Sequence, residues 1–230
     1  MPSDFDLGGV ICPWGRNVEE YEAFFRLSEV SPSARILDCG GGPSSFAADW
    51  GKRGRFVVAA DPVYRCAGIE IASGFESTAK RMLEGMERAR HRFKWDYYGS
   101  PEKVVTRRRN ALTTFVADFE DSSRPGRYVS AQLPELPFPS DSFDLVLCSH
   151  LLFLYSNELD IQMHVDSLKE MLRVAPEVRI FPLLDMDGQP SVHVNPSVAA
   201  VSTSAQAEVI AVPFEFQRGG SNMLRLTRPA

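Results

Sequence analysis

The chain has 230 residues, of which 44% are apolar and 24% charged, the proportions of an ordinary globular protein. Its net charge of −5 excludes a global attraction to nucleic acid or to anionic membranes, and no apolar run approaches the roughly 20 residues that span a bilayer. Residues 1–16 have neither the basic nor the apolar character of a secretory signal, and the four cysteines are scattered without the spacing of a zinc site. We therefore expect a cytoplasmic protein with free thiols, no membrane contact and one domain over residues 1–230.

The first half of the chain predicts helices that alternate with buried strands. Residues 17–30 carry apolar side chains at helical spacing. An apolar strand at 35–38 ends in an acid and is followed by a helix from about Ser44 to Trp50. Residues 54–61 predict a second buried strand that again ends in an acid.

The second half continues this pattern. Residues 143–150 predict another strand, and Asn157 is expected to cap a helix that runs through about Val174. A buried strand follows at 177–185, and residues 207–228 resemble a hairpin with its turn at Gly219-Gly220. The alternation predicts an α/β fold with a doubly wound, mostly parallel sheet and an antiparallel C-terminal hairpin.

Between the second and third strands, residues 62–127 are too long for an ordinary crossover and predict a helical insert. Its second helix begins with Ser100 as the N-cap and Pro101 at the first position. We expect this pair of helices to cover the carboxyl edge of the sheet as a substrate lid. The insert has a net positive charge, which leaves open phosphate or RNA binding, although charged helix faces are usually only solvated.

The glycine turn "RILDCGGGPSSF" between the first strand and its helix predicts a ligand that approaches the backbone closely. Gly40 and Gly42 fit the dinucleotide fingerprint G-x-G-x-x-G, but the third position is Ser45. A nicotinamide oxidoreductase is therefore an alternative that the motif argues against.

The acid before the glycines indicates another family. "ILDCGGGPS" resembles the first motif, D/E-x-G-x-G-x-G, of class I S-adenosylmethionine (SAM)-dependent methyltransferases, with Ser44 in place of the third glycine. Asp61 corresponds to that family's ribose-binding acid, and "LPELPFPSDSFDLVLCSHLLF" (133–153) resembles its segment at the fourth strand. The resemblance to methyltransferase type 11-like proteins implies a Rossmann-like fold with a seven-stranded sheet.

The resemblance also implies a cofactor site. Asp38 is suited to the ammonium of SAM, Asp61 to both ribose hydroxyls, and Gln132 to the adenine amino group. The glycine turn and the helix that follows it suit the carboxylate, whereas the end of the fourth strand would lie near the sulfonium. The expected cofactor-binding residues are Asp38, Cys39, Gly40, Gly41, Gly42, Asp61, Pro62, Gln132, Leu133, Cys148 and Ser149. No metal-ligand pattern is visible.

The implied reaction converts SAM to S-adenosylhomocysteine by in-line methyl transfer, which depends mainly on positioning. His150 is the candidate base, although it equally suits a helix cap or a cofactor contact. A small molecule is the favoured acceptor, and its reacting atom, oxygen, nitrogen, sulfur or carbon, stays open. The alternatives are an RNA methyltransferase and a catalytically silent SAM-binding subunit of a partner enzyme.

Three further residues or segments have competing interpretations. Asp144 begins its strand at the opposite edge of the sheet and is interpreted as structural. Cys148 as a nucleophile is disfavoured, because it lacks a flanking Pro-Cys. Residues 14–16 and Tyr21 precede the first strand, where they suit either a flap over the cofactor or core packing.

Overall fold

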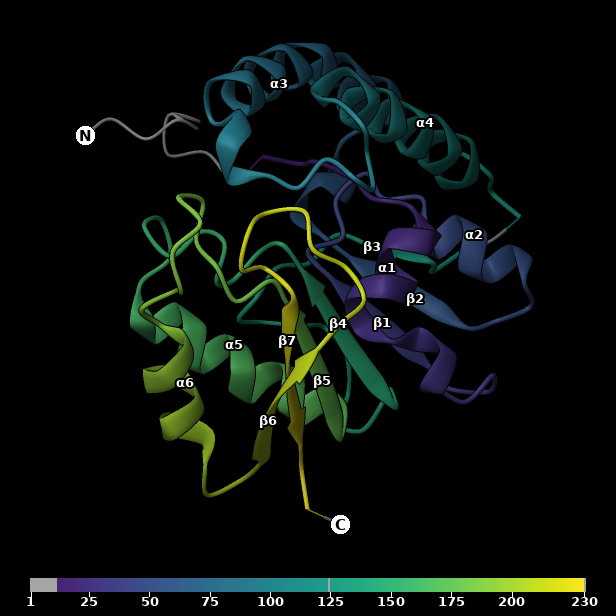
Figure 1. Ribbon diagram of the computed structural model, residues 1–230. Coiled ribbons are helices and arrows are strands. Elements are labelled where there is room, and N and C mark those ends of the chain that lie inside the picture. The colour runs from purple at the N-terminus through teal and green to yellow at the C-terminus, as the bar shows by residue number, and fades with distance from the viewer. Residues whose placement is uncertain (1–11, 124, 230) are drawn as a thin grey trace.

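The computed structural model describes residues 12–123 and 125–229; the expectation of no secretory signal therefore falls mostly outside the described residues. Seven strands form one sheet in the order β3-β2-β1-β4-β5-β7-β6, with β7 antiparallel to both β5 and β6 and the other pairs parallel (Figure 1). The strands are β1 Ile36–Cys39, β2 Val57–Ala60, β3 Tyr128–Val129, β4 Leu145–Ser149, β5 Glu177–Phe181, β6 Gln206–Ala211 and β7 Asn222–Thr227. The α-helices are α1 Val18–Phe25, α2 Phe46–Lys52, α3 Gly68–Arg88, α4 Pro101–Phe119, α5 Ile161–Val174 and α6 Val194–Val201. The predicted doubly wound sheet with an antiparallel C-terminal edge is confirmed.

Two apolar cores lie on opposite faces of the sheet, because successive side chains of a strand point to opposite sides. In β1, Ile36 belongs to the core that also contains α1 and α2, whereas Leu37 belongs to the core under α5. All four residues of β1 are buried. This burial on both faces explains the near-continuous apolar runs from which the strands were predicted.

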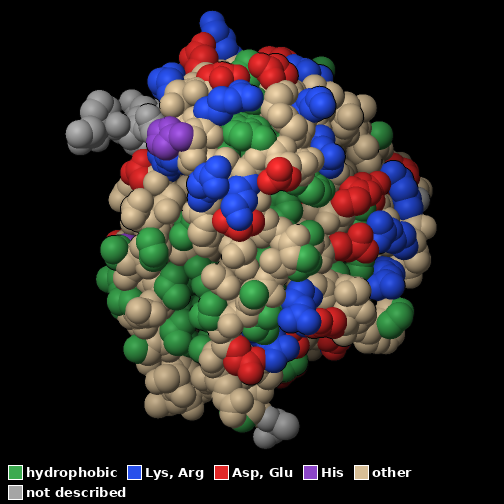
Figure 2. All heavy atoms as spheres, in the orientation of Figure 1, with side chains coloured by type: hydrophobic (Ala, Val, Ile, Leu, Met, Phe, Trp, Pro, Cys, Tyr) green, Lys and Arg blue, Asp and Glu red, His purple; other side chains and the backbone are tan. Residues whose placement is uncertain are grey.

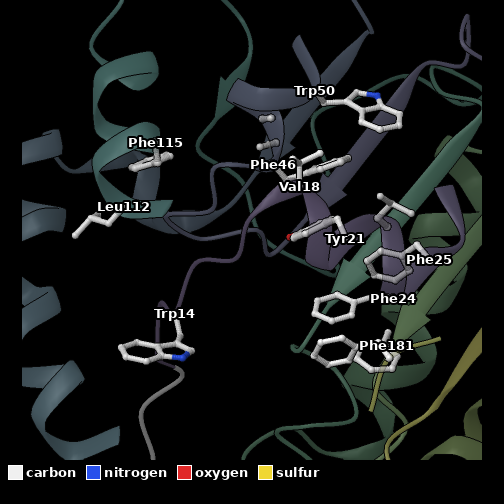
Figure 3. Close-up of a cluster of buried hydrophobic side chains, with 14 of the residues drawn as sticks. Trp14, Val18, Tyr21, Phe24, Phe25, Phe46, Trp50, Leu112, Phe115 and Phe181 are labelled. Carbon is white, nitrogen blue, oxygen red and sulfur yellow. The ribbon is translucent and has the colours of Figure 1, made fainter. Parts of the chain in front are cut away.

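Aromatic packing fixes α1 against the sheet (Figure 3). Tyr21 stacks on Phe46 of α2 with ring centroids 4.3 Å apart, and Phe24 stacks on Phe181 at the end of β5 at 4.6 Å. A capping box between Asn17 and Glu20 begins the helix. The segment just before α1 is therefore held at the carboxyl end of the sheet.

Several boundaries differ from the sequence expectation for local reasons. The first helix ends at Phe25, because Arg26 adopts a left-handed conformation (φ +50°), and only a 3-10 turn (Leu27–Glu29) follows. The N-cap of α5 is Asp160 rather than Asn157, since the Asp160 carboxylate accepts from the Met163 N–H at 2.8 Å. Strand β5 ends at Phe181 and not at 185, because Pro182 has no N–H to continue the ladder.

The C-terminal hairpin has a longer connection than the sequence suggested. The ladder between β6 and β7 ends at the pair Ala211–Asn222, and residues 212–221 form a loop. Gly219 has φ +82° within a tight turn of that loop, as expected for the glycine pair. Helix α6 was missed, because Pro196 interrupts its pattern; in the first helical turn, however, a proline is tolerated.

The insert forms the expected helix pair, α3 and α4, which pack against each other at one end of the molecule (Figure 1). Ser100 caps α4, accepting from the Lys103 N–H at 3.3 Å. Phe75 of α3 stacks on Trp14 with ring centroids 5.4 Å apart, so the insert rests on the N-terminal segment. On the face in Figure 2, the Lys and Arg side chains of this end are interspersed with Asp and Glu.

Candidate active site

A cavity of about 400 Å³ opens at the carboxyl ends of β1, β2 and β4. Its wall contains the glycine turn after β1, the residues that follow β2, and the residues at the end of β4. Strand β1 is flanked by β2 on one side and β4 on the other, so the chain winds in opposite directions from this point. Doubly wound sheets bind ligands at such a point, and the volume suits a cofactor-sized ligand.

The glycine turn has a backbone that only glycine adopts easily. Gly40 has φ +71° and Gly42 has φ +54°. The Gly40 N–H donates to the Ala60 carbonyl at 2.8 Å, which ties the turn to the end of β2. A Cβ atom on Gly41 would lie 2.3 Å from an oxygen of Asp38, so the middle glycine is required by packing as well.

Asp61 lies in the cavity wall and organises the turn beside it. One carboxylate oxygen accepts from the Gly42 N–H at 2.9 Å, and the other accepts from the Val63 N–H at 2.8 Å. Burial raises the pKa of this carboxyl group, and the two backbone N–H donors act in the opposite direction. A carboxylate has about four lone-pair positions, so Asp61 can still accept from a ligand.

Asp38 does not reach the cavity wall. Its side chain is fully buried, and the Tyr21 hydroxyl donates to its carboxyl group, 3.1 Å from each oxygen. Burial raises the pKa of Asp38 to about 8, and the hydrogen bond from Tyr21 opposes this effect. Asp38 therefore supports the turn from behind, under Gly41; its contact with the cofactor ammonium, directly or through water, stays a prediction.

Cys148 is also buried behind the wall, within β4, where burial raises the pKa of its thiol to about 12. A thiol with so high a pKa is a poor nucleophile, in agreement with the sequence interpretation. The other predicted cofactor-binding residues do meet at this cavity: Cys39, Gly40, Gly41, Gly42, Asp61, Pro62, Gln132, Leu133 and Ser149. Asp144 lies at the other edge of the sheet and pairs with Arg35 at 3.2 Å, as expected of a structural acid.

His150 lies at the end of β4 and lines the same cavity. It has φ +52°, and its N–H donates to the Phe181 carbonyl at 2.6 Å. Its Nδ1 lies 2.9 Å from the Ser149 hydroxyl. Burial, together with the charges of Arg16 and Arg108, holds the pKa of His150 well below 6.5, so the imidazole is neutral at physiological pH.

A second, smaller cavity of about 90 Å³ adjoins the first. Arg16 and His150 line both cavities, whereas Arg108 and Tyr98, from the insert, line only the smaller one. The sequence marked residues 14–16 as a flap, and it marked Arg108 and Tyr98 only as part of a basic, aromatic insert that leaves phosphate or RNA binding open. Both residues reach this site through packing of the insert, which the sequence did not predict. No residue of α3 or α4 lines the larger cavity; the insert reaches that cavity only through its first residues, from Pro62 to Cys66, whereas α3, α4 and the segment between them contribute to the smaller one.

Two general properties of the described residues bear on the site. Within 12–123 and 125–229, no three His, Cys, Asp or Glu side chains gather as metal ligands. Over the same ranges, every helix is too short or too polar to cross a bilayer.

Comparison with known proteins agrees with the fold. A family model described as a methyltransferase domain matches residues 104–177. A putative SAM-dependent methyltransferase from Methanococcus maripaludis has a similar structure, with a TM-score of 0.50, 11% identity and coverage of 93% of this chain and 84% of that one. Magnesium protoporphyrin IX methyltransferase from Synechocystis, solved with bound SAM, gives a TM-score of 0.48 at 10% identity, over 92% and 78% of the two chains.

These observations define the class: the chain carries a SAM-dependent methyltransferase domain with the Rossmann-like fold of class I. It belongs to the same family as the uncharacterised protein MJ0045 of Methanocaldococcus jannaschii, with which it shares 31% identity over 219 residues, 93% of this chain and 95% of that protein. The predicted enzyme class, with SAM as its cofactor, is confirmed at this level.

Proposed function

We propose that this chain transfers the methyl group of SAM to a small-molecule acceptor by in-line transfer. The observation that carries this proposal is the larger cavity, which joins the glycine turn and Asp61 to Ser149 and His150 and shares a wall with the smaller cavity. Arg16 and His150 line both cavities, so a cofactor in the larger cavity and an acceptor in the smaller one would lie next to each other at these two residues.

The larger cavity fits SAM in size and in chemistry. The turn Gly40–Gly42 presents backbone without side chains to the cavity, so a ligand can approach its N–H groups closely. We assign Asp61 to the ribose hydroxyls, and Pro62, Gln132 and Leu133 to the adenine side. Cys39 and the turn Gly40–Gly42 would hold the methionine portion, with Asp38 and Cys148 acting from behind the wall.

When bound, SAM supplies an already activated methyl group, so the chain's own task is to position the acceptor and manage its proton. His150 is our candidate base, because a neutral imidazole at the boundary between the two cavities can accept a proton. Its low pKa suits an acceptor that is itself acidic, since a weakly basic imidazole removes an acidic proton most easily.

We propose residues 1–230 as a single methyltransferase domain in which 62–127 acts as a lid over the N-terminal segment and 207–228 closes the sheet. The stacking of Phe75 on Trp14 and the hydrogen bond from the Cys12 thiol to the Thr78 hydroxyl (3.6 Å) support the lid. A cytoplasmic location remains part of this proposal, on the sequence pattern alone.

RNA as acceptor is the weaker alternative, because the visible Lys and Arg side chains on the insert are mixed with acids rather than gathered in one patch (Figure 2). A silent SAM-binding subunit predicts cofactor binding without turnover by the isolated chain. A nicotinamide oxidoreductase predicts NADH binding.

Calorimetric titration with SAM, S-adenosylhomocysteine and NADH, each on the purified chain, tests the proposal. We expect micromolar binding of both adenosyl ligands and none of NADH. Absence of adenosyl binding would refute the enzyme assignment for the isolated chain, and NADH binding in its place would support the oxidoreductase.

A further inference from the structure

The backbone of Arg16 is fixed at the start of α2, so its side chain has a defined place between the two cavities. The Arg16 carbonyl accepts from the Ser45 N–H at 3.0 Å and from the Ser44 hydroxyl at 2.6 Å. The preceding Gly15 packs so closely that an added Cβ would lie 2.0 Å from the Pro43 carbonyl oxygen. The position of Arg16 is therefore set by the same turn that shapes the larger cavity.

The Arg16 guanidinium has no carboxylate partner among residues 12–123 and 125–229. Its Nη1 donates to the Trp14 carbonyl at 2.8 Å, while its Nε is shielded from solvent and makes no hydrogen bond to the described residues. Burial, and next the charge of Arg108, lower the pKa of Arg16 to about 10. The half-buried guanidinium lines both cavities with only a backbone carbonyl as its hydrogen-bond partner, and a cation held partly out of water without a counter-charge indicates a site made for an anion.

The wall of the smaller cavity carries more positive than negative charge. Arg108 Nη1 pairs with Glu20 at 2.6 Å, and its Nη2 donates to the Tyr98 hydroxyl at 2.8 Å. Glu20 also accepts from the Tyr98 hydroxyl and from the Asn17 N–H, so its carboxylate has three donors and none of them is Arg16. One carboxylate thus faces two guanidinium groups.

Among residues 12–123 and 125–229, the other titratable groups near the smaller cavity do not offset this positive charge. His150 is neutral, and Asp38 lies on the far side of Tyr21 with a pKa of about 8, so it is mostly protonated at neutral pH. The smaller cavity therefore keeps an excess of about one positive charge.

Apart from Gln217, the rest of the wall of the smaller cavity is apolar and largely aromatic. Phe93 and Phe216 stack with centroids 4.6 Å apart, and Tyr98 meets Phe216 edge-on at 4.6 Å. Met82 and Met186 complete the wall with flexible side chains that can adjust to a ligand. A volume of about 90 Å³ admits only a compact body.

We propose that the smaller cavity binds the methyl acceptor as a small, flat organic acid, with its carboxylate at Arg16 and its apolar body against the stacked pair Phe93 and Phe216. This inference rests on the proposed function, because it makes the cavity that adjoins the cofactor site the acceptor site.

The carboxylate of SAM itself is the competing partner for Arg16, because Arg16 also lines the larger cavity. The acceptor is favoured for two reasons. Arg108, the charge that most affects Arg16, lines only the smaller cavity, and the glycine turn already offers backbone N–H groups to the cofactor.

The test compares benzoate with its uncharged isostere benzamide on the protein saturated with S-adenosylhomocysteine, by calorimetry. We expect benzoate to bind at least tenfold more tightly than benzamide. Arg16→Gln should abolish this preference while changing the dissociation constant of S-adenosylhomocysteine less than threefold. Arg16→Lys, which keeps the charge, should retain part of the preference, and Arg53→Gln, an exposed arginine paired with Glu22, is the matched control that should change neither.

Equal binding of the two probes, or binding of neither by protein that binds S-adenosylhomocysteine, would overturn the inference. A tenfold loss of S-adenosylhomocysteine affinity in Arg16→Gln would overturn it too, since Arg16 would then serve the cofactor. Circular dichroism shows whether Arg16→Gln folds. If it does not, the preference of the wild type for benzoate over benzamide, and its partial retention in Arg16→Lys, still test the inference. Failure of the wild type to bind S-adenosylhomocysteine overturns the proposed function instead, and the acid preference is then measured on the unloaded protein.

Discussion

The Tyr21 hydroxyl lies 3.1 Å from both oxygens of Asp38, and this contact joins α1 to the end of β1 inside the core. Both side chains are fully buried. The acid that identifies the family motif in the sequence is therefore held by a residue 17 positions earlier and supports the glycine turn from within.

The buried carboxyl group of Asp38 makes stability depend on pH. Its folded-state pKa of about 8 exceeds the ordinary value of 3.8, so its stabilising contribution is complete below about pH 4 and is lost as pH rises to about 8. We expect Asp38→Asn to remove this dependence, which amounts to a few kcal/mol in the free energy of unfolding. Urea denaturation of the unliganded protein between pH 4 and 9 measures it.

Tyr21→Phe provides the companion test, because the hydrogen bond from Tyr21 lowers the pKa of Asp38. Its removal should extend the pH range of decreasing stability above pH 8. Parallel pH profiles for wild type and Asp38→Asn would contradict the buried placement.

Substitutions of Asp61 and Asp144 should have different effects, because Asp61 lines the larger cavity whereas Asp144 has a structural role at the other edge of the sheet. Asp61→Ala should weaken S-adenosylhomocysteine binding by roughly 10- to 100-fold, about 1–3 kcal/mol, because the ribose hydroxyls lose an acceptor and the Gly42 N–H loses its partner. Asp144→Ala, at the other edge of the sheet, should leave that affinity unchanged and lower stability by about 1 kcal/mol or less. Calorimetry and thermal unfolding measure both, and equal affinities for all three proteins would refute the ribose assignment.

Replacement by alanine should change the free energy of unfolding in opposite directions at Gly41 and at Gly74. Gly41→Ala should destabilise the protein by more than about 1 kcal/mol and weaken cofactor binding, because the new Cβ would lie 2.3 Å from an oxygen of the immobile Asp38. Gly74→Ala, within α3 and with nothing near the added carbon, should stabilise by roughly 0.5–1 kcal/mol. Chemical denaturation distinguishes them; a neutral Gly41→Ala would mean that the turn is looser than described.

Arg108 and Arg109 are neighbours on α4 and form ion pairs of very different burial. Arg108→Ala should cost about 3–5 kcal/mol, because it leaves Glu20 as an unpaired buried charge. Arg109→Ala removes an exposed pair with Glu76 and should cost about 0–1 kcal/mol. The free energies of unfolding from urea titrations measure this difference, and similar losses would contradict the packing of the insert onto α1.

His150 should stay neutral where an ordinary histidine titrates, because burial and the two nearby arginines lower its pKa. We expect its ring resonances, assigned with His150→Gln, to show no titration between pH 6 and 8. Arg16→Gln should raise the pKa by removing one of the positive charges. A midpoint near 6.5 in the wild type would contradict this environment.

The amino-acid sequence by itself determined the order of helices and strands and the edge at which the site forms. The apolar runs ending in Asp38 and Asp61 predicted parallel strands, whose carboxyl ends must meet at one edge, and Gly40 and Gly42 predicted the turn there. Local patterns were sufficient because chain direction and glycine conformations are properties of short segments.

Only the tertiary structure decided which of these side chains face the cavity. Asp38 and Cys148 were expected at the wall but are buried behind it, since the packing of α1 and α5 covers them. Arg16 and Arg108, separated by 92 positions in the sequence, come to one cavity because the insert folds back onto the segment before α1. The charge and size of the proposed acceptor site arise from this long-range packing, which no local pattern encodes.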